Sequence, residues 1–198
     1  VVIEKARSAS VDFPDTAYVA AGARIAADAG EVLAGSDLVL KIQPPSEAEI
    51  DSLRTGAVLV AILQPFQNGD TVRRLAEKSV TSFSLDLLPR ITRAQAMDVL
   101  SSQAGMAGYK SVLIAAQLAP RFFPMLTTAA GTIRPSKVLI VGAGVAGLQA
   151  IATAKRLGAQ VEGFDVRPET REQIESLGGK FLDLGVSAAG EGGYARAL

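Results

Sequence analysis

The sequence predicts an α/β protein with mostly parallel sheets, divided into two lobes. Three observations indicate this class. Short β-rich runs alternate with helical runs that have one polar face, which is typical of parallel sheets covered by helices. The length of 198 residues suits one large or two small domains. Hydrophobic residues make up 48% of the chain, so it is rich enough in apolar residues to fold.

The composition excludes several classes of function. The chain has 20 Lys and Arg against 20 Asp and Glu, which argues against binding nucleic acid by neutralising its phosphates. It has no Cys and no His, so the usual zinc ligands, every thiol nucleophile and the commonest general base are missing. We therefore expect no metal site and no nucleic-acid partner.

The first half of the chain predicts strands and helices in alternation. Ser46 to Glu49 has the pattern of an N-terminal cap for a helix that reaches about Arg54. The continuous apolar run 57–63 is typical of a strand covered on both faces. In the helix predicted over 70–78, Val72 and Leu75 are expected to point inward. The other expected elements are strands at 1–3, 38–42 and 81–87 and a helix at 15–26.

A long helix is predicted between the halves. Thr92 and Gln95 fit a capping box, and the helix can continue to about Leu118 before Pro120 stops it. It is long enough to join two lobes. We expect a first lobe over residues 1–96, and the linking helix with a second lobe over residues 97–198.

The second lobe has the pattern strand, helix, strand, helix, strand. A turn region rich in small residues is expected at 125–132. The elements that follow are strands at 137–142, 160–165 and 180–184 and helices at 145–157 and 168–177.

Neither a membrane span nor a leader peptide is expected. The longest stretch without charge, residues 138–154, is shorter than the ~20 apolar residues that cross a bilayer. The chain starts without Met and without a basic segment followed by an apolar one, and it ends in a loop-like stretch. We expect a fragment that is incomplete at both ends and does not insert into a membrane.

The motif G-x-G-x-x-G lies between a predicted strand and a predicted helix. In such a motif the first glycine allows a tight turn, the second lets a pyrophosphate approach the backbone, and the third lets the helix pack closely. Phosphates then meet the N–H groups at the positive end of the helix. The candidate residues at this turn are Gly142, Ala143, Gly144, Val145 and Gly147.

Asp165 ends the next strand, close to the ~20-residue offset at which an acid binds the adenosine ribose. A carboxylate there accepts hydrogen bonds from a diol and repels a 2′-phosphate, which favours NAD over NADP. Arg167 favours NADP instead, because an arginine at this place can bind the 2′-phosphate. The alternative interpretation is that the glycines only make a tight turn and that Asp165 is a solvated strand end. With these motifs, the expected fold is two Rossmann-like lobes with a cleft between them.

Three segments together resemble one family. They are RITRAQAMDVLSSQ at 90–103, GAGVAGLQAIATAKRLGA at 142–159 and FDVR at 164–167. The chain is similar to the NAD(H)-binding component of the proton-translocating NAD(P) transhydrogenases, which is the alpha subunit or domain I. The first segment is far more specific than the glycine motif.

The resemblance implies a nucleotide site, residue by residue. Asp165, Val166 and Arg167 match the contact to the adenosine ribose, and Gly193 and Tyr194 match a mobile loop that closes over the nucleotide. The residues matching the loop and helix start around the nicotinamide are Arg90, Ile91, Thr92, Arg93, Gln95, Ala96, Met97, Asp98 and Ser101.

Simpler roles exist for several of these residues. Gln95, Asp98 and Ser101 are three apart, so one helix face could present all of them to the carboxamide of nicotinamide. Gln95 could instead only complete the capping box, and Asp98 could pair with Arg93 or Arg90. Ser101 could be an ordinary helix hydroxyl, and a tail tyrosine such as Tyr194 needs no role.

The resemblance implies direct hydride transfer between NADH on this component and NADP⁺ on a partner component. Transfer between two nicotinamides releases no substrate proton, so no catalytic acid or base is expected, and the chain only positions the ring and excludes water. The resemblance also implies a homodimer that works with an NADP-binding and a membrane-spanning component. Its expected location is peripheral, on the cytoplasmic side of the bacterial inner membrane or on the matrix face in mitochondria. Alone, these 198 residues are expected to be inactive.

Two alternatives remain open. One is an NAD-dependent amino-acid oxidoreductase similar to alanine dehydrogenase, in which a Lys and a His follow the first-lobe strands. Gln43 and Gln64 stand at the matching positions here, and neither is a general base, although Lys41 lies close by. The other alternative is a non-catalytic module that only binds NAD.

Overall fold

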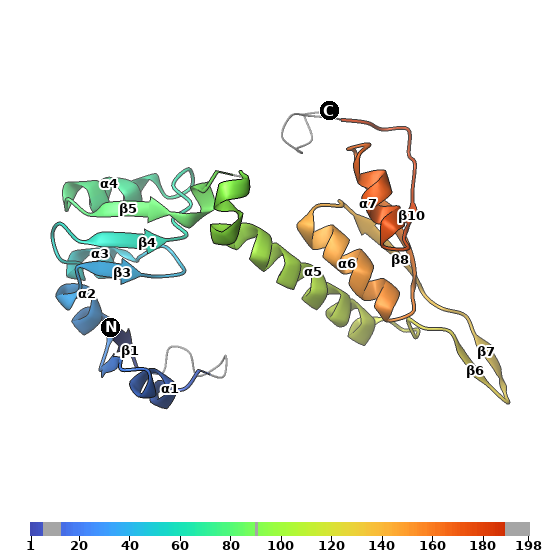
Figure 1. The fold of residues 1–198 in the computed structure, drawn as a ribbon, viewed down its shortest axis with the longest axis horizontal. Helices are drawn as coiled ribbons and strands as arrows, with labels where there is room; N and C mark the ends of the chain where they lie inside the picture. The colour runs from blue at the N-terminus through green and yellow to red at the C-terminus, as the bar shows by residue number, and fades with distance from the viewer. Residues whose placement is uncertain (6–12, 90, 189–198) are drawn as a thin grey trace. The chain divides into compact units, whose positions relative to one another are not determined.

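The computed structural model describes residues 1–5, 13–89 and 91–188 (Figure 1). It consists of two compact units, residues 1–98 and 99–198. Each unit has its own hydrophobic core and its own parallel sheet of three strands. The α/β class with mostly parallel sheets is therefore confirmed.

In the first unit, β4 is the central strand of the parallel sheet β3–β4–β5, and β1 and β2 form a separate parallel pair. Its elements are β1 (Val2–Glu4), α1 (Asp15–Ala20), β2 (Arg24–Ala26), α2 (Ala29–Gly35), β3 (Leu38–Leu40), α3 (Glu47–Ser52), β4 (Val58–Ala61), α4 (Gly69–Glu77) and β5 (Thr81–Ser84).

The predicted helix at 15–26 is wrong in its second half. The chain turns at Gly22, whose φ of 86° is in the left-handed region, and residues 24–26 then pair with β1. The cap at Ser46 is confirmed, because the Ser46 side chain accepts the Glu49 N–H and Glu49 accepts the Ser46 N–H.

The core of the first unit lies on one face of β4. Leu59 and Ala61 are fully buried, whereas Val58 and Val60, which alternate with them, are only partly buried. This strand is therefore fully covered on one face and covered only in part on the other. Leu75 of α4 is buried as predicted, but Val72 is exposed.

The predicted continuous helix from Thr92 is also wrong. Residues Thr92–Met97 form a 3₁₀-helix (η3) whose N-cap is Ile91, and no side chain caps it. The chain then turns at Asp98, whose ψ is 87°, and only afterwards does α5 begin (Val99–Leu118). Another 3₁₀ turn, η2 (Leu85–Leu87), follows β5.

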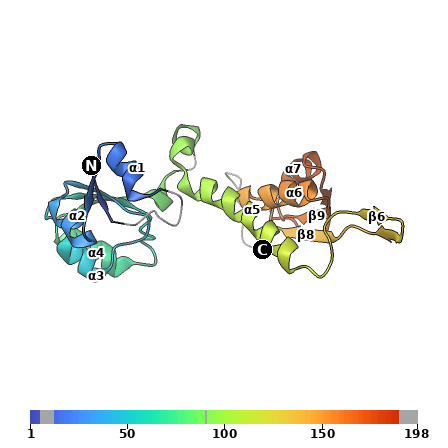
Figure 2. The ribbon, with the colours of Figure 1, turned by 90° about the horizontal axis from the view of Figure 1, so that it is seen from below.

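In the second unit, the sheet has the strand order β10–β9–β8, and all its strands are parallel. The hairpin β6–β7 is antiparallel and projects away from the rest of this unit, in place of the turn region expected at 125–132 (Figures 1 and 2). The further elements are β6 (Leu126–Thr128), β7 (Gly131–Ile133), β8 (Lys137–Val141), α6 (Val145–Arg156), β9 (Gln160–Phe164), α7 (Thr170–Ser176) and β10 (Lys180–Phe181).

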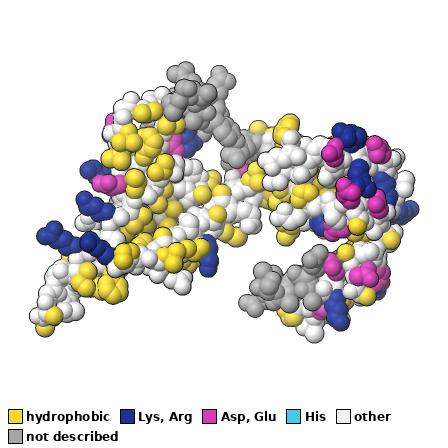
Figure 3. Space-filling view, turned by 180° about the vertical axis from the view of Figure 1, so that it is seen from behind, with side chains coloured by type: hydrophobic (Ala, Val, Ile, Leu, Met, Phe, Trp, Pro, Cys, Tyr) yellow, Lys and Arg dark blue, Asp and Glu magenta, His cyan; other side chains and the backbone are white. Residues whose placement is uncertain are grey.

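The helices of the second unit pack on one face of its sheet. Val138 and Ile140 of β8 contact the core that contains Ile151 of α6, while Leu139 and Val141 alternate to the other face. Leu139 and Val141 are 53% and 74% exposed. Seen from behind, this unit displays many hydrophobic side chains (Figure 3).

No helix in the described part of the chain is both long enough and apolar enough to cross a membrane. Within the same residues, no group of three or more Asp and Glu side chains is arranged to hold a metal ion.

Candidate nucleotide-binding site

The turn between β8 and α6 uses each of its glycines for a different physical reason. Gly142 has a φ of 92°, which side chains rarely allow. A Cβ on Gly147 would lie within 2.8 Å of the Gly142 carbonyl group, so the start of α6 packs tightly on the turn. A Cβ on Gly144 would meet nothing within 4 Å, so the space beside it is open. These are the three roles of glycine in a dinucleotide-binding turn.

The start of α6 offers N–H groups to a ligand. Gly144 is the N-cap of this 12-residue helix, and no side chain caps it. The first turn of an α-helix has N–H groups without acceptors inside the helix, and it carries the positive end of the helix dipole. This combination suits an anionic group such as a pyrophosphate.

The pairing of β8 with β9 brings Asp165 to the glycine turn. Val141 lies opposite Phe164, and the Gly142 N–H donates to the Phe164 carbonyl oxygen at 2.8 Å. One residue further on, the Ala143 N–H donates to Asp165 Oδ2 at 2.7 Å. Asp165 is therefore joined directly to the turn, and the interpretation of Asp165 as a solvated strand end is wrong, because only 8% of the residue is exposed.

Arg167 forms a two-pronged ion pair with Asp165. Its Nε donates to Oδ1 and its Nη2 to Oδ2, both at 2.9 Å, and its backbone N–H donates to Oδ1 at 2.9 Å. The hydrogen bonds from the Arg167 side chain are the main reason that the pKa of Asp165 is lowered to about 2, and they outweigh the opposing effect of burial. The same pair raises the pKa of Arg167.

Val166, the residue between them, accepts a hydrogen bond at its carbonyl oxygen from the Ala188 N–H at 2.8 Å. The segment after β10 thus lies beside the end of β9. Gly193 and Tyr194, which were expected to belong to a loop over the nucleotide, lie outside the described residues.

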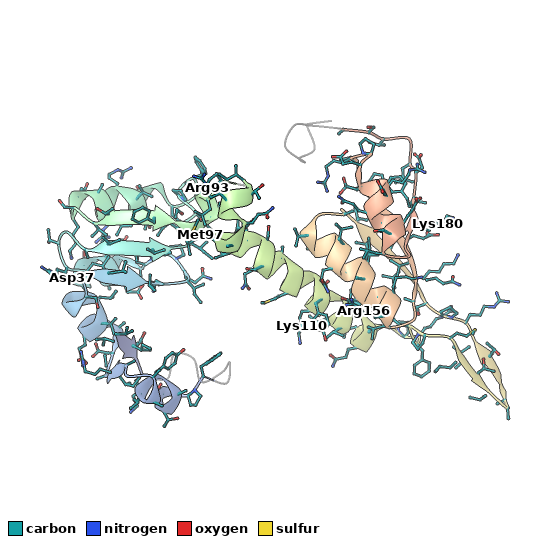
Figure 4. All side chains as sticks on the ribbon, in the orientation of Figure 1. Asp37, Arg93, Met97, Lys110, Arg156 and Lys180 are labelled. Atoms are coloured by element: carbon teal, nitrogen blue, oxygen red, sulfur yellow. The ribbon has the colours of Figure 1, made fainter. Side chains whose placement is uncertain are left out.

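The residues expected around the nicotinamide, apart from Arg90, lie where the 3₁₀ turn η3 meets α5. Most of them are exposed, including Arg93 and Met97, which are labelled in Figure 4. Asp98 and Ser101 are partly buried, and each takes part in an interaction. Because the chain turns at Asp98, Gln95, Asp98 and Ser101 do not share one face of one helix. Arg90 lies outside the described residues.

The carboxyl edge of the first sheet carries a feature that the sequence did not reveal. Gln64, just after β4, has a φ of 49°, an unusual conformation for a residue other than glycine. Asp86 holds this turn, because its Oδ1 accepts hydrogen bonds from the Leu63 N–H, the Gln64 N–H and Ser84 Oγ. Burial raises the pKa of Asp86, but these hydrogen bonds outweigh burial, and the pKa is lowered.

We expect Asp86→Ala to reduce the free energy of unfolding by about 2 kcal/mol, because the Gln64 N–H at a strained turn loses its acceptor and the Leu63 N–H keeps only a longer bond to Ser84 Oγ, at 3.3 Å. Denaturant unfolding followed by circular dichroism measures the change. Asp37→Ala is the control, because Asp37 pairs with Arg54 on the surface and its side chain is 86% exposed. Equal stability of the two variants would contradict a structural role for Asp86.

A separate hollow of about 860 Å³ lies at the base of the β6–β7 hairpin. Its wall includes Lys137 and Gln160, which are the first residues of β8 and β9. The glycine turn follows the last residue of β8, so the hollow and the turn lie at opposite ends of that strand. The hollow is therefore not part of the candidate nucleotide site.

Comparison with known proteins gives consistent matches over the chain. Residues 1–107 match the family described as "Alanine dehydrogenase/PNT, N-terminal domain", and residues 111–192 match "Alanine dehydrogenase/PNT, C-terminal domain". The chain is 45% identical to an NAD(P) transhydrogenase subunit alpha protein of Rhodospirillum rubrum, over 100% of this chain and 54% of the relative. The chain thus spans about half the length of this relative.

Two solved structures are also similar. The crystal structure of transhydrogenase from Sinorhizobium meliloti matches with a TM-score of 0.89 and 49% identity, over 92% of this chain and 55% of that chain. An L-alanine dehydrogenase matches with a TM-score of 0.76 and 26% identity, over 91% of this chain and 51% of that chain.

Proposed function

Because this chain belongs to the alanine dehydrogenase/PNT family, we propose that it is the NAD(H)-binding component of a proton-translocating transhydrogenase. The observation that carries the proposal is the junction of the glycine turn with Asp165, at one edge of a parallel sheet. In open α/β sheets, ligands bind at the carboxyl ends of the strands, where this junction lies.

The residues at the turn fit a dinucleotide. The open space at Gly144 and the uncapped start of α6 would receive the pyrophosphate. Asp165, Val166 and Arg167 would face the adenosine ribose, and the carboxylate of Asp165 favours the 2′-hydroxyl of NAD(H) over a 2′-phosphate. The segment 91–101, together with Arg90, would surround the nicotinamide, and Gly193 and Tyr194 would belong to the closing loop.

The chain needs no acid or base for this role. A bound dihydronicotinamide supplies a hydride, and its transfer to NADP⁺ on a partner component leaves no proton for a side chain to take. What the residues of this chain contribute is the position of the ring and the exclusion of water. The absence of His and Cys from the sequence is compatible with this role.

The proposal includes partners and a location. A homodimer of this component would act with an NADP-binding component and a membrane-spanning component, and hydride transfer would be coupled to proton movement. The relatives are named as alpha subunits, which supports a multi-subunit enzyme. The proposed location is peripheral, on the cytoplasmic side of a bacterial inner membrane or on the matrix face in mitochondria.

The alanine-dehydrogenase alternative needs a general base, and the described residues argue against one near the first sheet. Gln43 and Gln64 are exposed and carry no basic group. Lys41 is engaged in an ion pair with Glu49, which is part of the cap of α3. Reduction of NAD⁺ that depends on an added amino acid would support this alternative instead.

The decisive experiment measures nucleotide binding and hydride exchange with the full-length protein. Calorimetric titration is expected to give tight binding of NADH and much weaker binding of NADPH. With the NADP-loaded partner component added, stopped-flow absorbance is expected to follow hydride transfer. Binding of NADH without any transfer would support the non-catalytic module, and no binding of either nucleotide would refute the proposal.

We expect Asp98→Asn to slow single-turnover transfer at least tenfold, if Asp98 orients the nicotinamide as the family resemblance implies. Asp70→Asn is the control, because Asp70 is exposed and pairs only with Arg73 of its own helix in the described residues. Thermal unfolding of both variants tests the fold. An unchanged transfer rate in Asp98→Asn would show that Asp98 does not orient the nicotinamide.

A further inference from the structure

The acceptor positions of the Asp165 carboxylate are all occupied. Oδ1 receives the Arg167 N–H and Nε, each at 2.9 Å. Oδ2 receives the Ala143 N–H at 2.7 Å and Arg167 Nη2 at 2.9 Å. A carboxylate offers about four acceptor positions. A ribose diol therefore finds none left on Asp165 unless a present donor leaves.

The four donors differ in their freedom to leave. Two are backbone N–H groups, which belong to the glycine turn and to the end of β9 and hold the carboxylate from both sides. The other two belong to the guanidinium of Arg167, at the tip of a side chain that is 19% exposed. Rotation of the Arg167 side chain vacates one position on each oxygen of Asp165, and the two backbone bonds keep the carboxylate in place.

The vacated positions match the ligand. The two adjacent hydroxyls of a ribose donate two hydrogen bonds, and the carboxylate without its guanidinium accepts one at each oxygen. We propose that Arg167 competes with the adenosine ribose for Asp165, so that NAD(H) binds by exchanging the guanidinium for the 2′- and 3′-hydroxyls. This inference rests on the proposed function and identifies Arg167 as a residue that sets nucleotide affinity and specificity.

The same ion pair gives a reason for NADP(H) to bind more weakly than NAD(H). A 2′-phosphate has no hydrogen to donate to Asp165, and its charge repels the carboxylate. Arg167 would be a suitable phosphate partner, but its Nε and Nη2 already donate hydrogen bonds to Asp165. The ion pair thus keeps Arg167 from binding the 2′-phosphate of NADP(H).

The first test replaces Arg167 with a neutral side chain. In the full-length protein without its partner component, Arg167→Gln is expected to bind NADH about fivefold more tightly, because no ion pair has to be opened. The loss of Arg167 also raises the pKa of Asp165, so NADH binding by the variant should weaken as the pH falls from 6 to 4, while the original protein changes less. Calorimetric titration at each pH measures both effects.

Matched variants separate this role from a loss of structure. Arg171→Gln removes a similar arginine, which pairs with Asp183 on the surface, and is expected to leave NADH affinity unchanged. Arg167→Lys keeps the charge but cannot form the bidentate pair, and it is expected to bind NADH about twofold more tightly. This variant tests the proposal if Arg167→Gln does not fold. Unchanged or weaker NADH binding in the folded Arg167 variants would refute the proposal that Arg167 competes with the ribose for Asp165.

The second test asks whether Asp165 withholds Arg167 from a phosphate. Asp165→Asn cannot accept both prongs of the guanidinium, so it is expected to bind NADPH about tenfold more tightly than the original protein. Asp165→Asn combined with Arg167→Gln should lose that gain. Equal NADPH affinity in the single and double variants would overturn the role in specificity. Failure of the unaltered protein to bind NADH would instead refute the proposed function.

Discussion

Gly108→Ala is expected to reduce the free energy of unfolding by about 3 kcal/mol or more, through overpacking of two helices. Gly108 lies on α5 and is buried against the start of α6. A Cβ at this position would lie within 3.0 Å of three backbone atoms of Ala146, which have no freedom to rotate away. The helices would have to separate, and the core between them would loosen.

Gly105, one turn earlier on the same helix, is the matched control. A Cβ there would meet only Val145 Cγ1, at 4.0 Å. Gly105→Ala is therefore expected to be neutral or to stabilise the helix by up to about 1 kcal/mol, because alanine is the better helix former. Denaturant unfolding of the two variants should give changes of opposite sign or very different size. Equal stability would show that α5 and α6 do not approach so closely.

Asp165→Ala is expected to weaken NADH binding roughly 10- to 100-fold and to reduce the preference for NADH over NADPH. The variant loses the proposed acceptor for the ribose hydroxyls, and it also loses the hydrogen bond that joins Ala143 to the end of β9. Titration with both nucleotides measures the effect. Asp183→Ala, which removes an exposed carboxylate of the same unit, is the control. Unchanged affinity for both nucleotides would remove Asp165 from the site.

The Asp165 carboxylate should make the free energy of unfolding depend on pH. The folded pKa of Asp165, about 2, is below the ordinary value of 3.8. Its contribution to stability is therefore present above pH 4 and is lost as the pH falls from about 4 through 2. The shift corresponds to about 2 kcal/mol. Unfolding measured between pH 5 and pH 2 should show a smaller loss in Asp165→Ala than in the original chain. Equal losses would contradict this assignment.

Apart from the β6–β7 hairpin, the strands and helices of the second unit could be predicted because their boundaries are marked locally. Glycines with positive φ stand at the ends of its elements, as Gly142, Gly158 and Gly178 do, and apolar runs lie between them. Strand β2 could not be predicted in this way. Its residues follow an alanine-rich helix, and only their pairing with β1, some 20 residues earlier, makes them a strand.

The position of Asp165 beside the glycine turn could be predicted, but its hydrogen bonds could not, and the role of these residues in binding stays a prediction. Spacing alone pointed to Asp165 beside the glycine turn, and the structure joins them. The bidentate ion pair of Arg167 with Asp165 depends on side-chain rotamers and burial, which cannot be seen in a sequence. Thr92 and Gln95 have the right types for a capping box, but the 3₁₀ geometry of their segment forms no such cap. The cleft expected between the lobes stays a prediction.

The uncapped start of α6 has a consequence for engineering. Ser or Asn at an N-cap typically stabilises a protein by about 1 kcal/mol, but at position 144 either side chain would fill the open space beside the turn. A side chain that stabilises this helix start would weaken the proposed binding of the pyrophosphate, which is the usual trade-off between stability and function. Attempts to raise the melting temperature of this protein should therefore begin at other helix ends.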